Sequence, residues 1–142
     1  MKKKAITLEL WQYVMDSSAL INIQRNRSIK ALEKRKGQIL IPEQVAWEVA
    51  YDPRVHKNDP LKKFVLDNPD AVITFKGEEG QEYLRFASQL GIGPGEAAAM
   101  AVAFKRNIPL VIDEKETKAR GKANNHGITT LSGREFLNGK SR

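Results

Sequence analysis

Short apolar runs alternate along the chain with longer segments in which apolar residues recur at helical spacing. Residues 12–16 form the first apolar run, and residues 17–23 follow with two hydroxyl side chains and then helical spacing. This pattern predicts a strand that leads directly into a helix. By the same criteria, further strands are predicted at 38–42, 71–75, 108–113 and 128–133.

Glycine and proline mark the ends of the other helical segments. Gly37 and Gly91 close two of these segments, and Pro42 occupies the first position of a third, as is typical of helix ends. Residues 53–70 mix prolines with an apolar stripe, which predicts a loop with a short helix. The remaining helices are predicted at 27–37, 42–52, 78–91, 95–107 and 114–127.

Strand and helix alternate through the whole chain, which predicts an α/β fold with a parallel sheet covered by helices on both faces. The 142 residues, 41% of them hydrophobic, suit one globular domain. No apolar segment approaches the roughly 20 residues that a membrane span needs. We therefore expect a protein that does not enter a membrane and that works in the cytoplasm.

Composition removes several classes of chemistry. The chain has no cysteine, which excludes disulfides, thiolate nucleophiles and zinc sites built on thiolates. Its imidazoles are limited to His56 and His126. Lys and Arg number 24 against 17 Asp and Glu, a net charge of +7 that favours a polyanionic partner. The alternative is that this excess serves only solubility, and charge alone does not separate RNA from DNA or anionic lipid.

Two short acids stand at the carboxyl ends of predicted strands. Asp16 ends the first strand, and Asp113 ends the strand at 108–113. Ligands of open parallel sheets bind beyond the carboxyl ends of the strands, so these carboxylates converge if the two strands are neighbours. Glu96 opens the helix before the second of these strands, and Glu48 lies on the helix that begins at Pro42. Four acids thus come from four separate segments.

Each acid also has a purely structural explanation. Asp16 with the two following serines makes a good helix N-cap, and Glu96 favours the dipole of its helix. Glu48 fits the solvated face of an amphipathic helix, and Asp113 fits a cap of the next helix. As a set, however, several carboxylates in one place repel one another unless a cation neutralises them. Hard ions with oxygen ligands, Mg²⁺ or Mn²⁺, are the natural partners of such a set.

Four sequence blocks carry a family resemblance. "VMDSSALI", "IPEQVAWEVA", "GPGEAAAMAVAF" and "LVIDEKETKARGKANNHGIT", in this order, resemble the motif blocks of the PIN domain family. The resemblance runs from about Tyr13 to Leu137. It implies a single domain over 1–142 with a three-layer α/β/α fold and a central, mainly parallel sheet, in which residues 1–10 are a flexible or edge-strand extension. Many members, including the VapC-type toxins, are metal-dependent ribonucleases.

The resemblance also assigns roles to residues. It implies that Asp16, Glu96 and Asp113 bind Mg²⁺ or Mn²⁺, that Glu48 completes the catalytic set by orienting water or bridging a second ion, and that the Ser18 hydroxyl lies near the metal. The last block departs from the family pattern, because "DE" stands further than usual from "AR". Asp113 is preferred as the last acid, since it ends the strand and has a short side chain; the alternatives are Glu114 and Glu116.

Basic residues flank the predicted acidic cluster. They are candidates for contacts to phosphate groups, and the alternative is that they are solvated parts of helix faces. These residues are Arg25, Arg27, Lys30, Lys118 and Arg120. Aromatic residues such as Trp47 are either core residues or platforms for bases.

Two functional hypotheses follow from the sequence. The first is a metal-dependent endoribonuclease, in which a metal-held water attacks an RNA phosphodiester. The family resemblance extends this hypothesis to the toxin of a VapBC-type pair, with RNA as substrate, a cognate antitoxin as partner, and a homodimer as the assembly. The second is a non-catalytic nucleic-acid-binding or assembly module on the same fold, in which the acids serve as helix caps or hold a structural ion.

Overall fold

A parallel sheet of five strands forms the centre of the molecule, in the order β3-β2-β1-β4-β5. The computed structural model describes residues 11–113 and 119–139. The central strand β1 pairs on one side with β2 and on the other with β4, so that Val14 lies between Leu40 and Leu110. The strands are β1 (Tyr13–Met15), β2 (Ile39–Pro42), β3 (Val72–Ile73), β4 (Leu110–Val111) and β5 (Thr130–Leu131).

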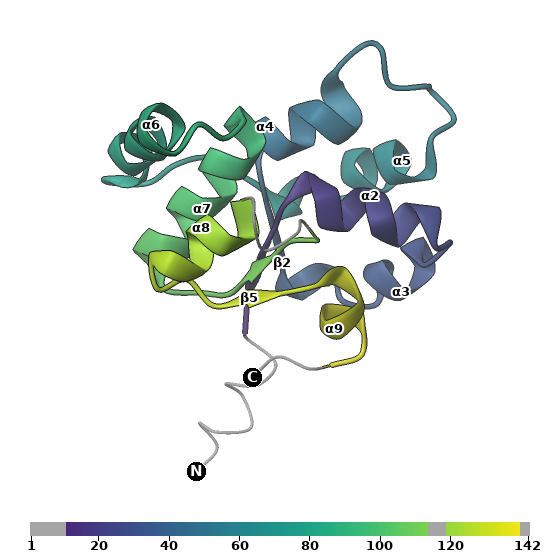
Figure 1. Ribbon diagram of the computed structural model, residues 1–142. Coiled ribbons are helices and arrows are strands. Elements are labelled where there is room, and N and C mark those ends of the chain that lie inside the picture. Colours follow the sequence, from purple (N-terminus) through teal and green to yellow (C-terminus); the bar gives the residue numbers. More distant parts are fainter. Residues whose placement is uncertain (1–10, 114–118, 140–142) are drawn as a thin grey trace.

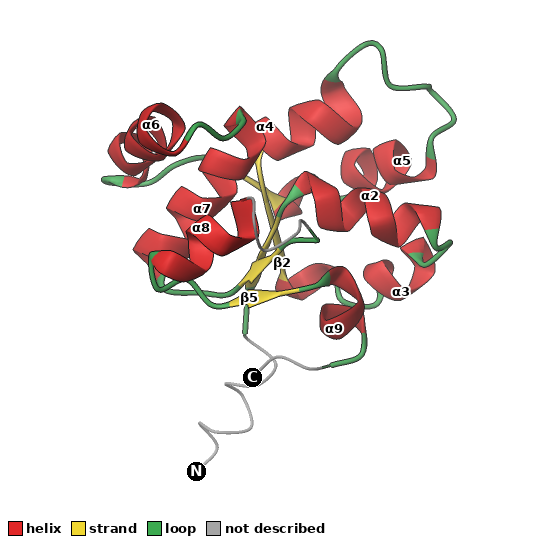
Figure 2. Cartoon of the chain, viewed as in Figure 1, coloured by secondary structure: helices red, strands yellow, loops and turns green. Residues whose placement is uncertain are grey.

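Helices cover both faces of this sheet, which confirms the three-layer α/β/α prediction. Figure 1 shows α2, α3, α5 and α9 on one side of the strands and α6, α7 and α8 on the other. Figure 2 shows how short the strands are beside the helices. The α-helices are α2 (Ser17–Arg25), α3 (Ile29–Glu33), α4 (Glu43–Ala46), α5 (Pro60–Asp67), α6 (Glu79–Leu90), α7 (Pro94–Arg106), α8 (Ala119–Asn125) and α9 (Gly133–Leu137).

The side chains of β1 alternate between two hydrophobic cores, as the pleat of a strand requires. Tyr13 and Met15 belong to the core under α2, α5 and α9, whereas Val14 belongs to the core under α7. Helix α7 contributes alanines that are fully buried, and their small side chains let the helix lie close to the sheet while α6 packs on its outer side. The sheet is therefore buried on both faces, as expected for parallel strands.

Several element boundaries differ from the sequence-based predictions. The helix predicted at 27–37 is reduced to α3 and the 3-10 turn η1 (Lys36–Gln38). Arg27, with a left-handed φ of 58°, lies before α3, and Arg35 leaves helical geometry between α3 and η1. The helix predicted at 42–52 continues from α4 into a π-helical segment, η2 (Trp47–Tyr51). A further 3-10 turn, η3 (Pro69–Ala71), precedes β3.

Two differences concern the end of the chain. Helix α9 was not predicted; it begins with a capping box in which the Ser132 hydroxyl accepts from the Glu135 backbone and the Glu135 carboxylate accepts from the Ser132 backbone. The start of the helix predicted at 114–127 falls on residues 114–118, which lie outside the described part of the chain. None of the helices in the described ranges is long and apolar enough to cross a membrane.

Candidate functional site at the carboxyl ends of the strands

Asp16 is held where β1 ends and α2 begins. Its backbone N–H donates to the Val111 carbonyl at 2.9 Å, which fastens the ends of β1 and β4 together. Its side chain is almost fully buried, with 1% of the residue exposed. The Oδ2 atom accepts from the Ser18 backbone N–H at 3.1 Å and from the Ser18 hydroxyl at 2.7 Å. The helix-capping role considered for Asp16 is thus present, and the carboxylate also lies at the expected edge of the sheet.

The Ser18 hydroxyl connects the two strand-end acids. While it donates to Asp16, the same Oγ atom accepts from the backbone N–H of Asp113 at 3.0 Å. The prediction that Asp16 and Asp113 converge is supported by this bridge, because one oxygen atom contacts both residues. Sequence reasoning singled out Ser18 through the family resemblance but did not foresee this bridging geometry.

Two further groups hold the half-buried carboxylate of Asp113. Its Oδ2 atom accepts from the Asn22 side-chain amide at 3.2 Å, and its Oδ1 atom accepts from the Gly133 backbone N–H at 2.9 Å. A Cβ atom at Gly133 would lie 3.1 Å from Oδ2 and 3.2 Å from Ile23 Cγ1, so glycine lets α9 approach this acid without displacing either side chain. Asn22 and Gly133 are functional candidates that sequence reasoning missed, because only the tertiary contact reveals them.

The first turn of α7 carries Glu96 and is approached by Glu48. The Glu96 Oε1 atom accepts from the Gly93 backbone N–H at 3.1 Å and so caps the helix. The Glu48 carboxylate, which is exposed, lies against Gly95: a Cβ atom there would be 2.3 Å from Glu48 Oε1. Glu48 belongs to the π-helical segment η2, and π turns are frequent at functional sites. The neighbouring Trp47 is 52% exposed, so it is not a core residue.

The structure therefore links Asp16 to Asp113 through Ser18, and it places Glu48 against Gly95, the residue before Glu96. The carboxylate oxygens of these acids, with the Ser18 hydroxyl, are donors of the kind that Mg²⁺ and Mn²⁺ take. Within residues 11–113 and 119–139, no group of three or more Asp, Glu or His side chains lies close enough together to hold a metal ion. The alternative last acids, Glu114 and Glu116, fall in the segment that the structure does not describe.

The predicted basic residues behave differently from one another. Arg25, Arg27 and Lys30 are exposed and lie on consecutive parts of α2, the link to α3, and α3. Arg120 instead bonds within the protein: its Nε donates to Thr130 Oγ1 at 3.1 Å, and its guanidinium lies 3.7 Å from Glu135. Lys118 lies outside the described residues. Contacts of these side chains to nucleic acid stay a prediction.

A polar groove adjoins the strand-end acids between α2 and α9. It has a volume of about 650 Å³, and Asp113 forms part of its wall. Three asparagines and an arginine, none of them singled out from the sequence, give the groove its polar character. Its lining residues are Asn22, Ile23, Asn26, Ser28, Ala31, Asp113, Ser132, Arg134, Leu137 and Asn138.

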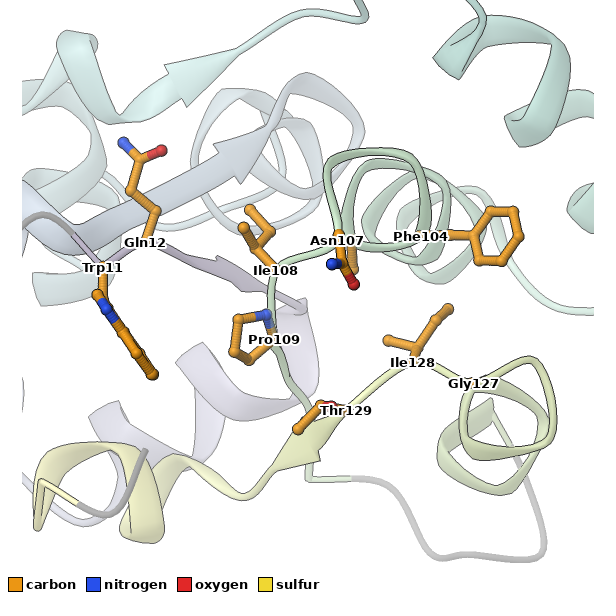
Figure 3. Close-up of a pocket in the computed structure, with 10 residues that line it drawn as sticks. Trp11, Gln12, Phe104, Asn107, Ile108, Pro109, Gly127, Ile128 and Thr129 are labelled. Atoms are coloured by element: carbon orange, nitrogen blue, oxygen red, sulfur yellow. The ribbon is translucent and has the colours of Figure 1, made fainter. Parts of the chain in front are cut away.

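A second hollow, of about 600 Å³, lies at the opposite, amino ends of the strands. Figure 3 shows Trp11, Ile108, Pro109 and Ile128 around it, with Asn107 at the end of α7. Asn107 has a φ of 57° and ends that helix in the left-handed conformation. None of the described residues that line this hollow carries a carboxylate.

Comparisons with known proteins agree with this architecture. A family model described as a PIN domain matches residues 12–132. The crystal structure of PAE2754 from Pyrobaculum aerophilum resembles the chain with a TM-score of 0.63 and 20% sequence identity, over 92% of this chain and 90% of that one. At this identity the likeness shows the fold alone. A search of curated proteins found no match.

Proposed function

The chain belongs to the PIN domain family, and on this premise we propose that it is a metal-dependent endoribonuclease. The observation that carries the proposal is the bridge from Asp16 through Ser18 to Asp113 at the carboxyl ends of β1 and β4. Two carboxylates held at one edge of a parallel sheet are placed where such folds bind their ligands. The family as a whole has a nuclease-like fold; metal dependence and RNA are the further content of the proposal.

In this proposal, Asp16 and Asp113 would hold one Mg²⁺ or Mn²⁺ ion, and Glu96, which caps α7 in this structure, would have to turn towards them to complete the metal ligands. A bound ion of this kind supplies an activated water and neutralises charge that develops on a phosphodiester. Ser18 keeps the two aspartates at a fixed separation, and Asn22 and the Gly133 N–H fix the orientation of the Asp113 carboxylate. Groups that orient a metal ligand in this way change metal affinity or activity about 10- to 100-fold when they are removed.

The exposed Glu48 carboxylate has a separate task. It would accept a hydrogen bond from the attacking water and take up its proton, for which an exposed carboxylate at the first turn of α7 is suited. The exposed side chains of Arg25, Arg27 and Lys30 attract the RNA backbone electrostatically. A homodimer, a cognate antitoxin, and a role as the toxin of a VapBC-type pair belong to this proposal through the family resemblance.

The second candidate, a non-catalytic binding or assembly module, is favoured by one observation. Asp16 and Glu96 both cap helices, and Asp113 accepts hydrogen bonds from Asn22 and Gly133, so these three acids each have a structural use. Under this candidate the acids stabilise the fold, and metal-dependent turnover is absent. The two candidates therefore differ in one measurable property, the cleavage of RNA.

The test compares two substitutions of the same chemical kind. Asp16→Asn removes a charge at the strand end, whereas Asp59→Asn removes one from Asp59, which caps α5 by accepting from Leu61 and Lys62. Purified proteins are incubated with a pool of structured and single-stranded RNA in Mg²⁺, Mn²⁺ or EDTA. We expect Asp16→Asn to lower metal-dependent cleavage at least about 100-fold and Asp59→Asn to change it less than about twofold. Equal cleavage by the wild type and Asp16→Asn overturns the nuclease proposal.

A further inference from the structure

The groove between α2 and α9 holds polar groups that the protein itself leaves unused. Across residues 11–113 and 119–139, the side chains of Asn26, Arg134 and Asn138 make no hydrogen bond or ion pair with the protein. All three are exposed and line the same groove. By contrast, the two serines of the groove are occupied: Ser28 donates to the Asn26 carbonyl, and Ser132 accepts from Glu135.

The groove is continuous with the strand-end acids. Asp113 forms part of its wall, and Asn22, which donates to Asp113 Oδ2, lines it as well. A ligand in the groove therefore lies next to the Asp113 carboxylate, which is a metal ligand in the proposed function. The volume of about 650 Å³ falls within the roughly 300–1,000 Å³ that is usual for small-molecule sites.

The chemistry of the lining selects the class of ligand. A side-chain amide offers both donors and an acceptor, and so matches the mixed donor and acceptor edge of a nucleobase. A guanidinium binds phosphate oxygens with two parallel hydrogen bonds. One arginine beside two unused amides thus matches a nucleotide better than it matches a metal ion or an apolar ligand.

We propose that this groove binds one unpaired ribonucleotide of an RNA strand, next to the phosphodiester that is cleaved. Arg134 holds a phosphate, and Asn26 and Asn138 contact the edge of the base. The position of this nucleotide beside the cleaved bond rests on the proposed function. The binding of a nucleotide in the groove does not. Bases in a duplex hide these edges and A-form helices have a narrow major groove, so the ligand is single-stranded.

Charge around the groove supports an extended strand rather than an isolated nucleotide. Arg27 stands between the lining residues Asn26 and Ser28, and Lys30 precedes the lining residue Ala31. Both cations are exposed, as is Arg25 at the end of α2. A strand that leaves the groove over the link between α2 and α3 therefore passes a row of positive charges, which suits the phosphates of neighbouring nucleotides.

The test measures binding in EDTA, where metal-dependent cleavage is absent. Fluorescein-labelled ten-nucleotide RNAs of mixed sequence are titrated with full-length wild type, Arg134→Ala and the double variant Asn26→Ala/Asn138→Ala. Lys57→Ala is the matched charge control, because Lys57 is exposed in the loop between η2 and α5 and does not line the groove. Thermal melting of each variant verifies that it is folded. Single-stranded DNA and duplex RNA of the same sequence are the comparison ligands.

We expect Arg134→Ala to weaken binding roughly five- to tenfold and to reduce the salt slope by about one unit. The amide double variant should weaken binding by a similar factor while its salt slope stays unchanged, and Lys57→Ala should bind within about twofold of the wild type. Wild-type affinity in both groove variants overturns the inference, as does equal or tighter binding of duplex RNA. Equal binding of DNA overturns its ribonucleotide part.

The outcome separates this inference from the proposed function. Groove-dependent binding by a protein that never cleaves RNA supports the groove and refutes the nuclease. Metal-dependent cleavage whose KM is the same in wild type, Arg134→Ala and the amide double variant supports the nuclease and refutes the groove. If the groove is used during turnover, the variants raise KM, whereas kcat changes much less.

Discussion

The two ends of the same sheet have opposite character. At the carboxyl ends, Asp16 and Asp113 are linked through one hydroxyl, and Asp113 is also held by a side-chain amide and a backbone N–H. At the amino ends, a hollow of similar size is lined mainly by Trp11, Pro109 and other groups without charge (Figure 3). Size alone therefore does not separate the two ends, but the placement of ionisable groups does.

This difference assigns different tasks to the two ends. The carboxyl end carries buried polar groups that are costly unless they are well paired, which is typical of functional sites. The amino end is walled by residues such as Ile128, which is 5% exposed and belongs to the core under α7. Substitutions at the carboxyl ends of the strands should therefore change activity, and substitutions at the amino ends should change stability.

The largest effect is expected from Asp113→Asn at the carboxyl end. The amide keeps the shape of the side chain but loses its charge and one of the two acceptors that serve Asn22 and Gly133. Metal-dependent RNA cleavage should fall at least about 100-fold. The free energy of unfolding, measured in urea, should fall by only about 1 kcal/mol. Wild-type activity in Asp113→Asn would contradict a catalytic role for the carboxyl ends of the strands.

Ile128→Ala is the reciprocal change at the amino end. Truncation of this buried side chain should lower the free energy of unfolding by about 2–4 kcal/mol, because it leaves a cavity in the core under α7. RNA cleavage per folded molecule should stay within about twofold of the wild type. Urea denaturation and a cleavage assay well below the melting temperature check both statements. Strong loss of cleavage by fully folded Ile128→Ala would instead indicate that the active site lies at the amino ends of the strands.

Gly95→Ala sharpens the comparison within the carboxyl end. The new methyl group would displace the Glu48 carboxylate, which is exposed and free to turn away, so the fold should tolerate it. We expect cleavage to fall about tenfold, a loss of general-base catalysis, with unchanged or slightly higher stability. Gly80→Ala is the matched control, because Gly80 also occupies the second position of its helix and its Cβ would have only an ordinary contact with Phe75 at 3.8 Å. Equal activity of the two variants would exclude a role for Glu48.

A smaller effect is expected at Asp52, which follows η2 and belongs to neither end. Hydrogen bonds from the side chain and backbone of Arg54 lower the pKa of Asp52 from 3.8 to about 2. The folded pKa lies below the unfolded one, so this contribution to stability is present above pH 3.8 and is lost as the pH falls towards 2.

Arg54→Gln should raise the pKa of Asp52 towards its ordinary value and remove that acid-range dependence. A carboxyl-carbon NMR titration of Asp52, with urea denaturation inside and above this pH window, checks the prediction. Cleavage of RNA near neutral pH should not change. An unchanged Asp52 titration in Arg54→Gln would show that another group lowers this pKa.

Much of the fold follows from the sequence because its signals are local. Apolar runs between helical segments predict all five strands, and the position of Asp16 and Asp113 at strand ends predicts that they meet. Boundaries are less predictable: the left-handed Arg27 shortens a predicted helix, since any residue type other than glycine gives little warning of positive φ. Ser132 and Glu135 form the capping box of α9. The helix was missed because Ser132 lies within the strand predicted at 128–133, while Glu135 lies after it.

The unpredicted parts of the site depend on contacts between distant segments. Asn22 and Gly133 act on Asp113 only because α2 and α9 pack beside the end of β4. Glu48 reaches Gly95 through the packing of α4 against α7, and no spacing along the chain encodes that approach. The same holds for the groove, whose asparagines lie in or just after α2 and just after α9, far apart in the sequence.

The central position of β1 has a consequence for the order in which the molecule assembles during synthesis. β1 is made first and can pair early with β2, but its other edge waits for β4, since Val14 pairs with both Leu40 and Leu110. Such long-range pairing is slow compared with local helix formation. Asp16 can cap α2 on a nascent chain, yet the link through Ser18 to Asp113 forms only after β4 has left the ribosome. Chemistry that needs both acids is thereby withheld from the unfinished protein.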